Sequence, residues 1–391
     1  MTHREYKGRL VLLDQNFRRI AWRSITLRRL QTVACTSLFI GLAACAPTSA
    51  NNGSGQGQKA SNNSTIKTFL PWNQNRKNLG RYDLGWQATP QRHPGNGISL
   101  AEILWGYTYP GRHWANYPGL DAFHLKNSSR RTEDGKQVDL RITDPKFPNF
   151  IGDIAVRQVK RFGVDGVLLD GWIDEPARRI PVAQQKAARV RIAKAIRSKV
   201  SDDFTIIGNV GWRSDTSTHR YLNGAYVELF KKATRRYTSS QIREIESLMM
   251  LHDSRLREPR IVAIETWRVN TGSRRRDAAT NLRFARLFAA MTAVVPRNGY
   301  FIYADNNSDS SLHDHDHVYY DFYDIDLGGP IGGAVRVKDG VKYKRYRDGL
   351  IAFNRTKRRA SISISGLPNI TIEGETGIFC RINQSRVDCD I

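Results

Sequence analysis

The pattern that most restricts the fold is an alternation of short apolar runs with longer stretches of helical periodicity. Six runs have the length and composition of buried strands: 81–86, 166–170, 204–208, 224–228, 261–265 and 300–305. Stretches with apolar residues three and four positions apart follow the same alternation, at 149–162, 181–200, 239–251 and 277–295. A parallel sheet covered by helices requires this arrangement.

Two weaker runs, 121–125 and 138–142, bring the number of expected strands to the eight of a (β/α)8 barrel. The length of 391 residues and the hydrophobic fraction of 40% are sufficient for a core of that size. We therefore predict an α/β fold, a TIM barrel over residues 78–335, with a doubly wound open sheet as the alternative. Short alternating runs later in the chain predict a small β region over 336–391, at 350–354, 360–365 and 376–382.

Residues 1–44 have the features of a bacterial export signal, because several arginines precede the apolar run "VACTSLFIGLAACA". The sequence "LAAC" at 42–45 resembles the lipobox of bacterial lipoproteins, which makes Cys45 the expected lipidated residue. An ordinary cleavable signal or a short buried helix is the alternative. Residues 46–65 are rich in Ser, Asn and Gly, so a flexible tether is expected over 45–77. These features predict a lipid-anchored protein of the bacterial cell envelope, on its periplasmic or cell-surface side.

The chain is strongly basic. Removing the eight Lys/Arg and two Asp/Glu of residues 1–44 from the net charge of +24 leaves +18. Such a charge favours anionic partners, an acidic polysaccharide among them. The basic residues are scattered, so no specific nucleic-acid site is predicted.

Two cysteines, Cys380 and Cys389, lie in the segment "CRINQSRVDC" near the end of the chain. Their spacing predicts a disulfide that closes a short hairpin in an oxidising compartment. Neither their number nor their spacing suits a zinc site.

Four expected strands end on or next to a carboxylate, at Asp170, Glu228, Glu265 and Asp305. In a parallel barrel the carboxyl ends of all strands open on one face, where catalytic residues lie. Neighbouring acids raise one another's pKa, so one can stay protonated while another is ionised. Glycoside hydrolysis needs one acid that protonates the leaving oxygen and one carboxylate that attacks the sugar or activates water. The same acids could instead bind a divalent metal, and any single one could be a helix cap or an ion-pair partner.

Polar and aromatic residues near the same strand ends are candidates for substrate binding. Four tryptophans fall at or within about four residues of a strand end, namely Trp86, Trp172, Trp212 and Trp267. Indole rings stack on the C–H faces of sugars, although core packing is the competing interpretation. Asn209 and Asp174 also follow strand ends and could hydrogen-bond sugar hydroxyls.

The loop "HDHDHVYYDFYD" at 313–324 places His313, His315 and His317 on one side if it is extended, a spacing compatible with a metal ion. We interpret it as a polar lid and predict no metal. The chain contains no GxGxxG, P-loop, GxSxG or HExxH motif, so no cofactor is expected.

Several segments together resemble the hypothetical glycosyl hydrolase families of TIM-barrel type: "VDLRITDP", "GVDGVLLDGW", "GAYVELF", "DFYDIDLGGPIG" and "GLIAFNRT". These families are distantly similar to endo-α-1,4-polygalactosaminidases and to the α-galactosidase clan. The resemblance spans about residues 78–355. It implies a retaining pair with Asp170 as nucleophile and Glu228 as acid/base, and Glu265 as a supporting carboxylate or alternative proton donor. A Glu on the sixth strand departs from the better-known members of the clan, which have Asp there.

The sequence therefore predicts a lipid-anchored, extracytoplasmic glycoside hydrolase acting on a polysaccharide. Two other classes remain open. One is a catalytically silent barrel that binds an anionic exopolysaccharide, and the other is a metal-dependent phosphoesterase that uses the acids with His313 and His315.

Overall fold

The computed structural model describes ten segments of the chain: residues 65–72, 76–87, 89–112, 117–132, 135–175, 178–229, 236–269, 278–304, 317 and 319–389. The expected signal, Cys45 and most of the expected tether lie outside these residues, as do Asp305, His313 and His315. Within the described segments, no helix combines the length and apolar composition needed to cross a membrane.

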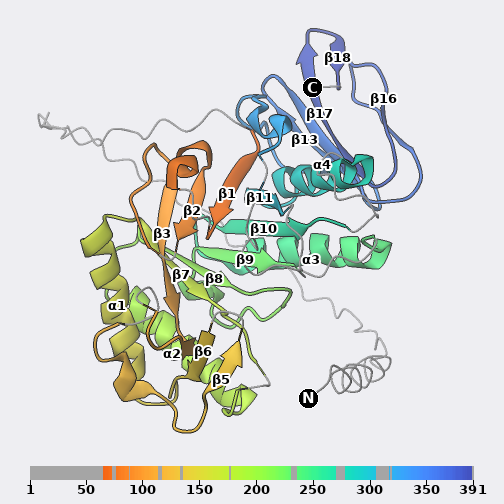
Figure 1. Cartoon of the computed structure of the whole chain (residues 1–391). Coiled ribbons are helices and arrows are strands. Elements are labelled where there is room, and N and C mark those ends of the chain that lie inside the picture. The colour runs from red at the N-terminus through yellow and green to blue at the C-terminus, as the bar shows by residue number, and fades with distance from the viewer. Residues whose placement is uncertain are drawn as a thin grey trace, which may run out of the picture. The chain divides into compact units, whose positions relative to one another are not determined.

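Eight parallel strands form a closed barrel (Figure 1): β1 (Lys67–Pro71), β2 (Leu84–Gln87), β3 (Ile98–Leu104), β7 (Gly166–Asp170), β8 (Thr205–Asn209), β9 (Gly224–Glu228), β10 (Ile261–Trp267) and β11 (Asn298–Ala304). They follow one another around the barrel in chain order, and β1 closes it by pairing with both β2 and β11. The predicted TIM barrel is confirmed, and the open-sheet alternative is wrong.

Six predicted strands correspond to β2 and to β7 through β11, but the two weaker ones are wrong. Residues 121–125 fall largely in the 3-10 helix η2 (Leu120–Phe123), and 138–142 overlap β6 (Gly135–Asp139). β6 belongs to a small antiparallel sheet outside the barrel, with β4 (Tyr107–Thr108) and β5 (Arg130–Thr132).

The two remaining barrel strands are β1 and β3, where no strand was expected. β1 lies inside the predicted tether, so the barrel begins before residue 78. Its five residues directly follow a polar segment whose composition concealed it. β3, "ISLAEIL", contains Ser99 and Glu102, which are buried, and these polar residues hid its strand character.

Four helices confirm the predicted ones: α1 (Phe147–Phe162), α2 (Val182–Arg197), α3 (Ser239–Arg255) and α4 (Ala279–Val294). α3 begins with a capping box, in which the Thr238 side chain accepts from the backbone of Gln241 while the Gln241 side chain accepts from the backbone of Thr238. In the described residues, the β1–β2 and β8–β9 connections contain only the 3-10 helices η1 (Arg76–Arg81) and η3 (His219–Tyr221).

An Asp or Asn just before a strand fixes the start of the preceding strand at three places. Asp83 accepts the backbone N–H of Thr68 on β1 at 2.8 Å, and Asp165 accepts that of Ser99 on β3 at 2.9 Å. Asn223 accepts the backbone N–H of Ile206 on β8 at 3.1 Å. These side chains satisfy amides that the strand ladder would otherwise leave unpaired, and so hold the amino-terminal end of the barrel in register.

The middle of the barrel is filled by aromatic rings. The ring centroids of Phe69 and Trp86 lie 5.2 Å apart, and those of Trp86 and Tyr226 lie 4.9 Å apart. All three side chains are buried. The barrel is therefore a packed core in its middle, and only its ends can hold a site.

The predicted C-terminal β region is present, with a sheet of five antiparallel strands and a separate hairpin. The sheet contains β12 (Val335–Lys338), β13 (Val341–Tyr346), β14 (Gly349–Asn354), β17 (Thr376–Asn383) and β18 (Arg386–Asp388), and the hairpin β15 (Ala360–Ile362) and β16 (Ile370–Ile372). β14 and β17 pack against α4.

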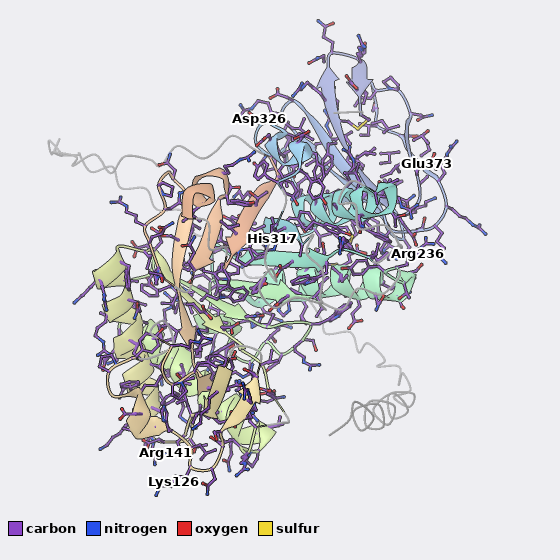
Figure 2. The ribbon with its side chains drawn as sticks, viewed as in Figure 1. Lys126, Arg141, Arg236, His317, Asp326 and Glu373 are labelled. Atoms are coloured by element: carbon purple, nitrogen blue, oxygen red, sulfur yellow. A yellow bond between two sulfur atoms is a disulfide. The ribbon has the colours of Figure 1, made fainter. Side chains whose placement is uncertain are left out.

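Ion pairs join the same sheet to the helices and loops of the barrel. Buried Glu246 of α3 pairs with Lys342 at 2.8 Å and with Arg355 at 2.5 Å. Arg236, labelled in Figure 2, pairs with Glu375. The β region is thus attached through both apolar and charged contacts.

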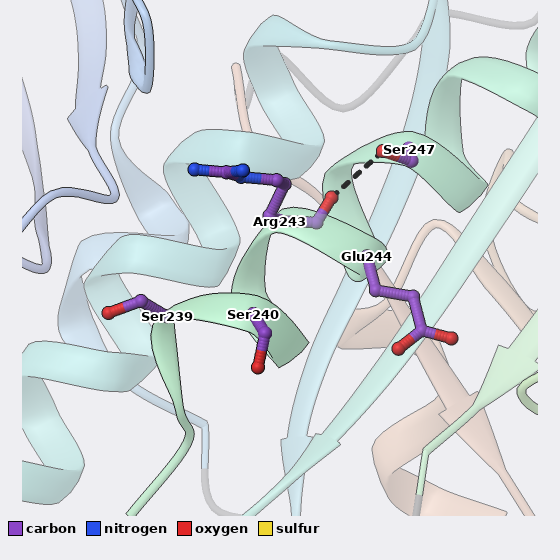
Figure 3. A pocket seen from close by; sticks show the side chains of 5 residues that line it. All are labelled: Ser239, Ser240, Arg243, Glu244 and Ser247. Atoms are coloured by element: carbon purple, nitrogen blue, oxygen red, sulfur yellow. Dashed lines mark hydrogen bonds between the residues drawn. The ribbon is translucent and has the colours of Figure 1, made fainter. Parts of the chain in front are cut away.

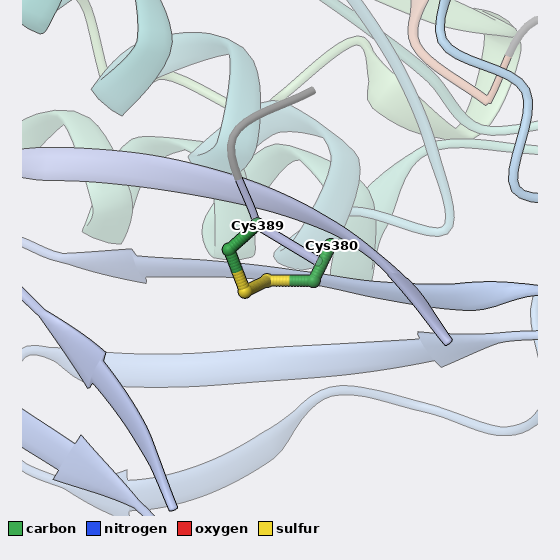
Figure 4. Close-up of a disulfide and its surroundings, with 2 residues drawn as sticks. All are labelled: Cys380 and Cys389. Carbon is green, nitrogen blue, oxygen red and sulfur yellow. A yellow bond between two sulfur atoms is a disulfide. The ribbon is translucent and has the colours of Figure 1, made fainter. Parts of the chain in front are cut away.

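The predicted disulfide is confirmed. Cys380 on β17 is bonded to Cys389, which directly follows β18 (Figure 4). The bond closes the hairpin formed by these two strands, and a loop of this length contributes about 2–3 kcal/mol.

A buried pair of histidines lies between η3 and α3. His252 Nε2 is 3.1 Å from the carbonyl oxygen of Arg213, which can only accept, so Nε2 carries the proton and Nδ1 is an acceptor. His219 Nε2, 2.7 Å away, then donates to that Nδ1. Burial lowers the pKa of His219 to about 3, and the neighbouring His252 contributes to this shift. Burial lowers the pKa of His252 to about 4. Both rings are therefore neutral in the folded protein.

We predict that acid destabilises the fold through this pair. Above pH 6.5 both rings are neutral in the folded and the unfolded chain, whereas below it only the unfolded chain takes up protons, until the pH nears 4. The loss should reach as much as about 4 kcal/mol for the two rings at pH 5. Thermal unfolding of the wild type and of the double variant His219→Gln/His252→Gln, at pH 7.5 and pH 5, measures it.

The double variant should lose less Tm on acidification than the wild type. The variant His124→Gln, which changes a half-buried histidine elsewhere, should behave as the wild type does. An equal drop in Tm for the wild type and the double variant would contradict the assignment of two neutral rings.

Candidate active site

Three residues at the carboxyl ends of neighbouring strands are joined by one side-chain amide. Asn209 ends β8, between Asp170 at the end of β7 and Glu228 at the end of β9. The Asn209 Nδ2 donates to Asp170 Oδ1 and to Glu228 Oε2, both at 2.9 Å. Asp170 and Glu228 are partly exposed. The structure thus brings together three of the predicted site residues.

The orientation of the Asn209 amide is fixed by the backbone. Gly211, at a φ of 51°, donates its N–H to Asn209 Oδ1 at 3.1 Å. Because the oxygen is committed to this donor, the NH2 group faces the two carboxylates. Both bonded oxygens are 2.9 Å from the same nitrogen, so the oxygens of Asp170 and Glu228 lie no more than twice 2.9 Å apart.

Tyr107 is a site residue that sequence reasoning missed. Its hydroxyl donates to Asp170 Oδ2 at 3.0 Å, so both carboxylate oxygens of Asp170 accept a hydrogen bond. Burial, and next the charge of Asp170, raise the pKa of Tyr107 well above its usual value, which keeps it a donor. Tyr107 lies in β4, and the aromatic segment "WGYTY" at 105–109 is the one signal that could have pointed to it.

The turn after Asp170 is held by an aromatic residue and a buried cation. Gly171 has a φ of 55°, and its carbonyl accepts from Trp105 Nε1 at 2.9 Å. The guanidinium of Arg178 lies 4.7 Å from the Trp105 ring and forms an ion pair with Glu175 at 3.2 Å. These contacts fix the backbone that carries the carboxylate.

Glu265 lies beside Glu228, since the two residues pair in register on β10 and β9. It is completely buried; His317 Nε2 is 2.7 Å from its Oε1, and the Tyr226 hydroxyl donates to its Oε2. Burial, then the charges of Glu228 and Glu265, raise the pKa of Tyr226 well above its usual value. With donors on both oxygens and no exposed surface, Glu265 fits the supporting role and not that of an alternative proton donor.

His317 is the one histidine of the predicted polar loop at 313–324 that the structure describes. It forms an isolated antiparallel bridge with Ala304 at the end of β11, and Figure 2 labels it. Its ring is directed at a carboxylate, which sequence spacing could not show. Among the residues that the structure describes, no cluster of three or more His, Cys, Asp or Glu could hold a metal ion.

Three of the four tryptophans predicted to bind sugar are core residues instead. Trp86 and Trp267 are 1% exposed and Trp172 is 0% exposed, so none presents a face to a ligand. Trp172 donates to Thr218 Oγ1 at 3.0 Å and packs on Trp105. Trp86 belongs to the layer in the middle of the barrel, whereas Trp172 contacts the connection that carries Thr218. Trp212 alone among the four is partly exposed.

Asp174 is also placed differently from the prediction. It pairs with Arg189 of α2 at 2.7 Å, and the same guanidinium pairs with Asp215 at 2.6 Å. Asp174 therefore ties the segment after β7 to α2 and does not join the carboxylates around Asn209.

A cavity of 390 Å³ lies at the first turns of α3 and contains none of the residues above (Figure 3). Its lining is a polar helix face: Ser239, Ser240, Arg243, Glu244 and Ser247. The Ser247 hydroxyl donates to the backbone of Arg243 at 3.0 Å, so this side chain is committed locally.

Comparison with known families decides the class of this site. The profile of hypothetical glycosyl hydrolase family 15 matches residues 106–349, well over half of the chain. The chain belongs to this family. Membership in this glycosyl hydrolase family, together with the closed barrel, assigns the protein to the glycoside hydrolases, and the sequence-based resemblance is confirmed. A search among curated proteins found no match.

Solved structures similar to this chain include an α-amylase and a glycoside hydrolase domain. An α-amylase from Geobacillus thermoleovorans is 14% identical, with 82% of this chain and 98% of that chain covered and a TM-score of 0.48. The glycoside hydrolase domain of PelA from Pseudomonas aeruginosa is 12% identical, with 64% and 97% covered and a TM-score of 0.42. Ega3 from Aspergillus fumigatus is 12% identical, with 65% and 95% covered and a TM-score of 0.42.

We predict that Glu265→Leu destabilises the protein by about 3 kcal/mol, because it leaves the buried polar groups of His317 and Tyr226 without their acceptor. Glu265→Gln, which keeps one acceptor oxygen, should cost less. Urea unfolding measures both. Glu244→Leu, at an exposed carboxylate of α3, is the matched control and should lie within about 0.5 kcal/mol of the wild type. A Glu265→Leu variant as stable as the control would show that these contacts do not hold the fold.

Proposed function

We propose that this member of hypothetical glycosyl hydrolase family 15 cleaves a polysaccharide by a two-carboxylate mechanism, with Asp170 as nucleophile and Glu228 as acid/base. The observation that carries the proposal is the Asn209 amide, which donates to both carboxylates at 2.9 Å. Two acids held this way at the carboxyl end of a barrel are the groups that glycoside hydrolysis needs.

The hydrogen bonds support this assignment of roles. Asp170 accepts from both Tyr107 and Asn209, so two donors hold the attacking carboxylate in place. In the proposed mechanism the catalytic proton is carried by Glu228. Glu228 then donates it to the leaving oxygen, Asp170 attacks the anomeric carbon, and Glu228 next deprotonates the water that releases the sugar.

The spacing favours retention of configuration at the anomeric carbon. Retaining enzymes hold their carboxyl groups about 5–5.5 Å apart, whereas inverting enzymes leave 6.5–9.5 Å for a water molecule. Two oxygens that are each 2.9 Å from the Asn209 nitrogen lie closer together than the inverting separation, which fits direct attack by Asp170.

The cellular setting is part of the proposal. The lipobox-like "LAAC" supports attachment of the mature chain to the bacterial envelope through a lipid on Cys45. The surplus of basic residues supports an anionic polysaccharide as substrate.

We predict that Asp170→Asn and Glu228→Gln each lower hydrolysis at least about 1,000-fold while Tm changes little, because both side chains are partly exposed. Release of reducing ends from soluble starch, alginate, polygalacturonate and a galactosamine polymer measures activity. An aryl glycoside of the sugar that is released separates the roles. Its good leaving group needs little protonation, so Glu228→Gln should retain formation of the glycosyl-enzyme and Asp170→Asn should not.

Glu244→Gln, which changes an exposed carboxylate of α3, is the control and should keep wild-type turnover. Wild-type turnover by either site variant would refute its assigned role. No release of reducing ends from any substrate over days, together with glycan binding that weakens steeply with salt, would instead support the non-catalytic binding barrel.

A separate prediction concerns Cys45. In a bacterial host, Cys45→Ser should move the protein from the membrane fraction to the soluble fraction, because a lipid chain is the proposed attachment. Fractionation followed by immunoblotting measures this, with Cys35→Ser as the control. An unchanged distribution of the Cys45 variant would contradict a lipid anchor at this residue.

A further inference from the structure

Trp72 follows β1 directly and lies at the same end of the barrel as the carboxylates. Around the closed ring of eight strands, β1 is four positions from β8 in either direction, so the two strands face each other across the barrel. β8 ends on Asn209, which holds Asp170 and Glu228. Trp72 is therefore placed opposite the catalytic pair.

The contacts of Trp72 connect it to the site. Its ring centroid lies 5.8 Å from that of Tyr226, whose hydroxyl donates to Glu265, and 5.8 Å from that of Trp86. Both neighbours belong to the aromatic layer that fills the barrel. Trp72 thus lies on that layer, and unlike Trp86 it is partly exposed.

The backbone at Trp72 is in a conformation that bulky residues avoid. Its φ of 44° belongs to the left-handed region, where Gly and Asn are favoured. The Trp72 N–H donates to the carbonyl of Trp86 at 3.0 Å, which helps to hold this conformation. Strained positions of this kind cluster at ligand-binding sites, where the side chain has to occupy one place.

We propose that Trp72 is the aromatic platform on which a pyranose ring of the substrate stacks while Asp170 and Glu228 act on it from the other side. This inference rests on the proposed function. An indole face offers apolar contact to the C–H groups of a sugar, and the opposite wall supplies the polar groups. Trp212 follows β8, on the wall of the catalytic pair, and so cannot face it across the barrel.

The test compares Trp72→Ala and Trp72→Phe on the polysaccharide that the wild type cleaves best. Trp72→Ala should raise KM at least 10-fold and change kcat less than about 3-fold, because stacking contributes to binding before the reaction. Trp72→Phe keeps a ring and should remain within about 3-fold of the wild-type KM. Tyr343→Ala, which removes a half-buried ring of β13 in the C-terminal sheet, is the matched control and should leave both constants unchanged.

A second measurement does not depend on turnover or on the stability of Trp72→Ala. Asp170→Asn is titrated with maltohexaose, with a galactosamine hexamer and with a galacturonate hexamer, and the change in tryptophan fluorescence is followed. The double variant Asp170→Asn/Trp72→Phe should lose that change. Thermal melts show which variants are folded.

The outcomes separate the two proposals. Two results would overturn the platform and leave the proposed function intact. One is hydrolysis by the wild type together with an unchanged KM for folded Trp72→Ala. The other is a fluorescence change that persists in the Trp72→Phe variant. A wild type that neither cleaves nor binds any of these glycans overturns both.

Discussion

A single side-chain amide organises this site. Asn209 can donate to Asp170 and Glu228 together because β8 lies between β7 and β9 and each of the three strands ends on one of these residues. The backbone N–H of Gly211 decides which end of the amide faces the acids. Every assignment of chemistry to this protein therefore depends on the register of three parallel strands and on one turn.

The barrel holds several acids at one end because each is supplied with hydrogen-bond donors. Buried Glu265 has His317 and Tyr226, and Asp170 has Tyr107 and Asn209. A buried carboxylate without such partners would cost more free energy than a domain can offset. The donors come from four separate parts of the chain, so the site forms only when the barrel closes.

The aromatic layer of Phe69, Trp86 and Tyr226 links stability to function. It fills the middle of the barrel, and one of its rings, Tyr226, also donates a hydrogen bond to Glu265. Trp72 rests on this layer at the open end. Two of the rings that form the core therefore also support the side chain that we propose as the sugar platform.

What the sequence determined by itself is local. Periodicity identified all four helices and six of the eight barrel strands, the spacing of Cys380 and Cys389 identified the disulfide, and strand-terminal acids placed Asp170 and Glu228 at one rim. These features follow from patterns within a few residues. The tertiary structure decided which tryptophans are buried, that Asp174 pairs with Arg189, and that β1, Tyr107 and His317 contribute to the site. Burial and pairing depend on contacts between strands that are far apart in the chain and meet only when the barrel closes. The pattern of residues along the chain does not show which of them will face one another across the barrel.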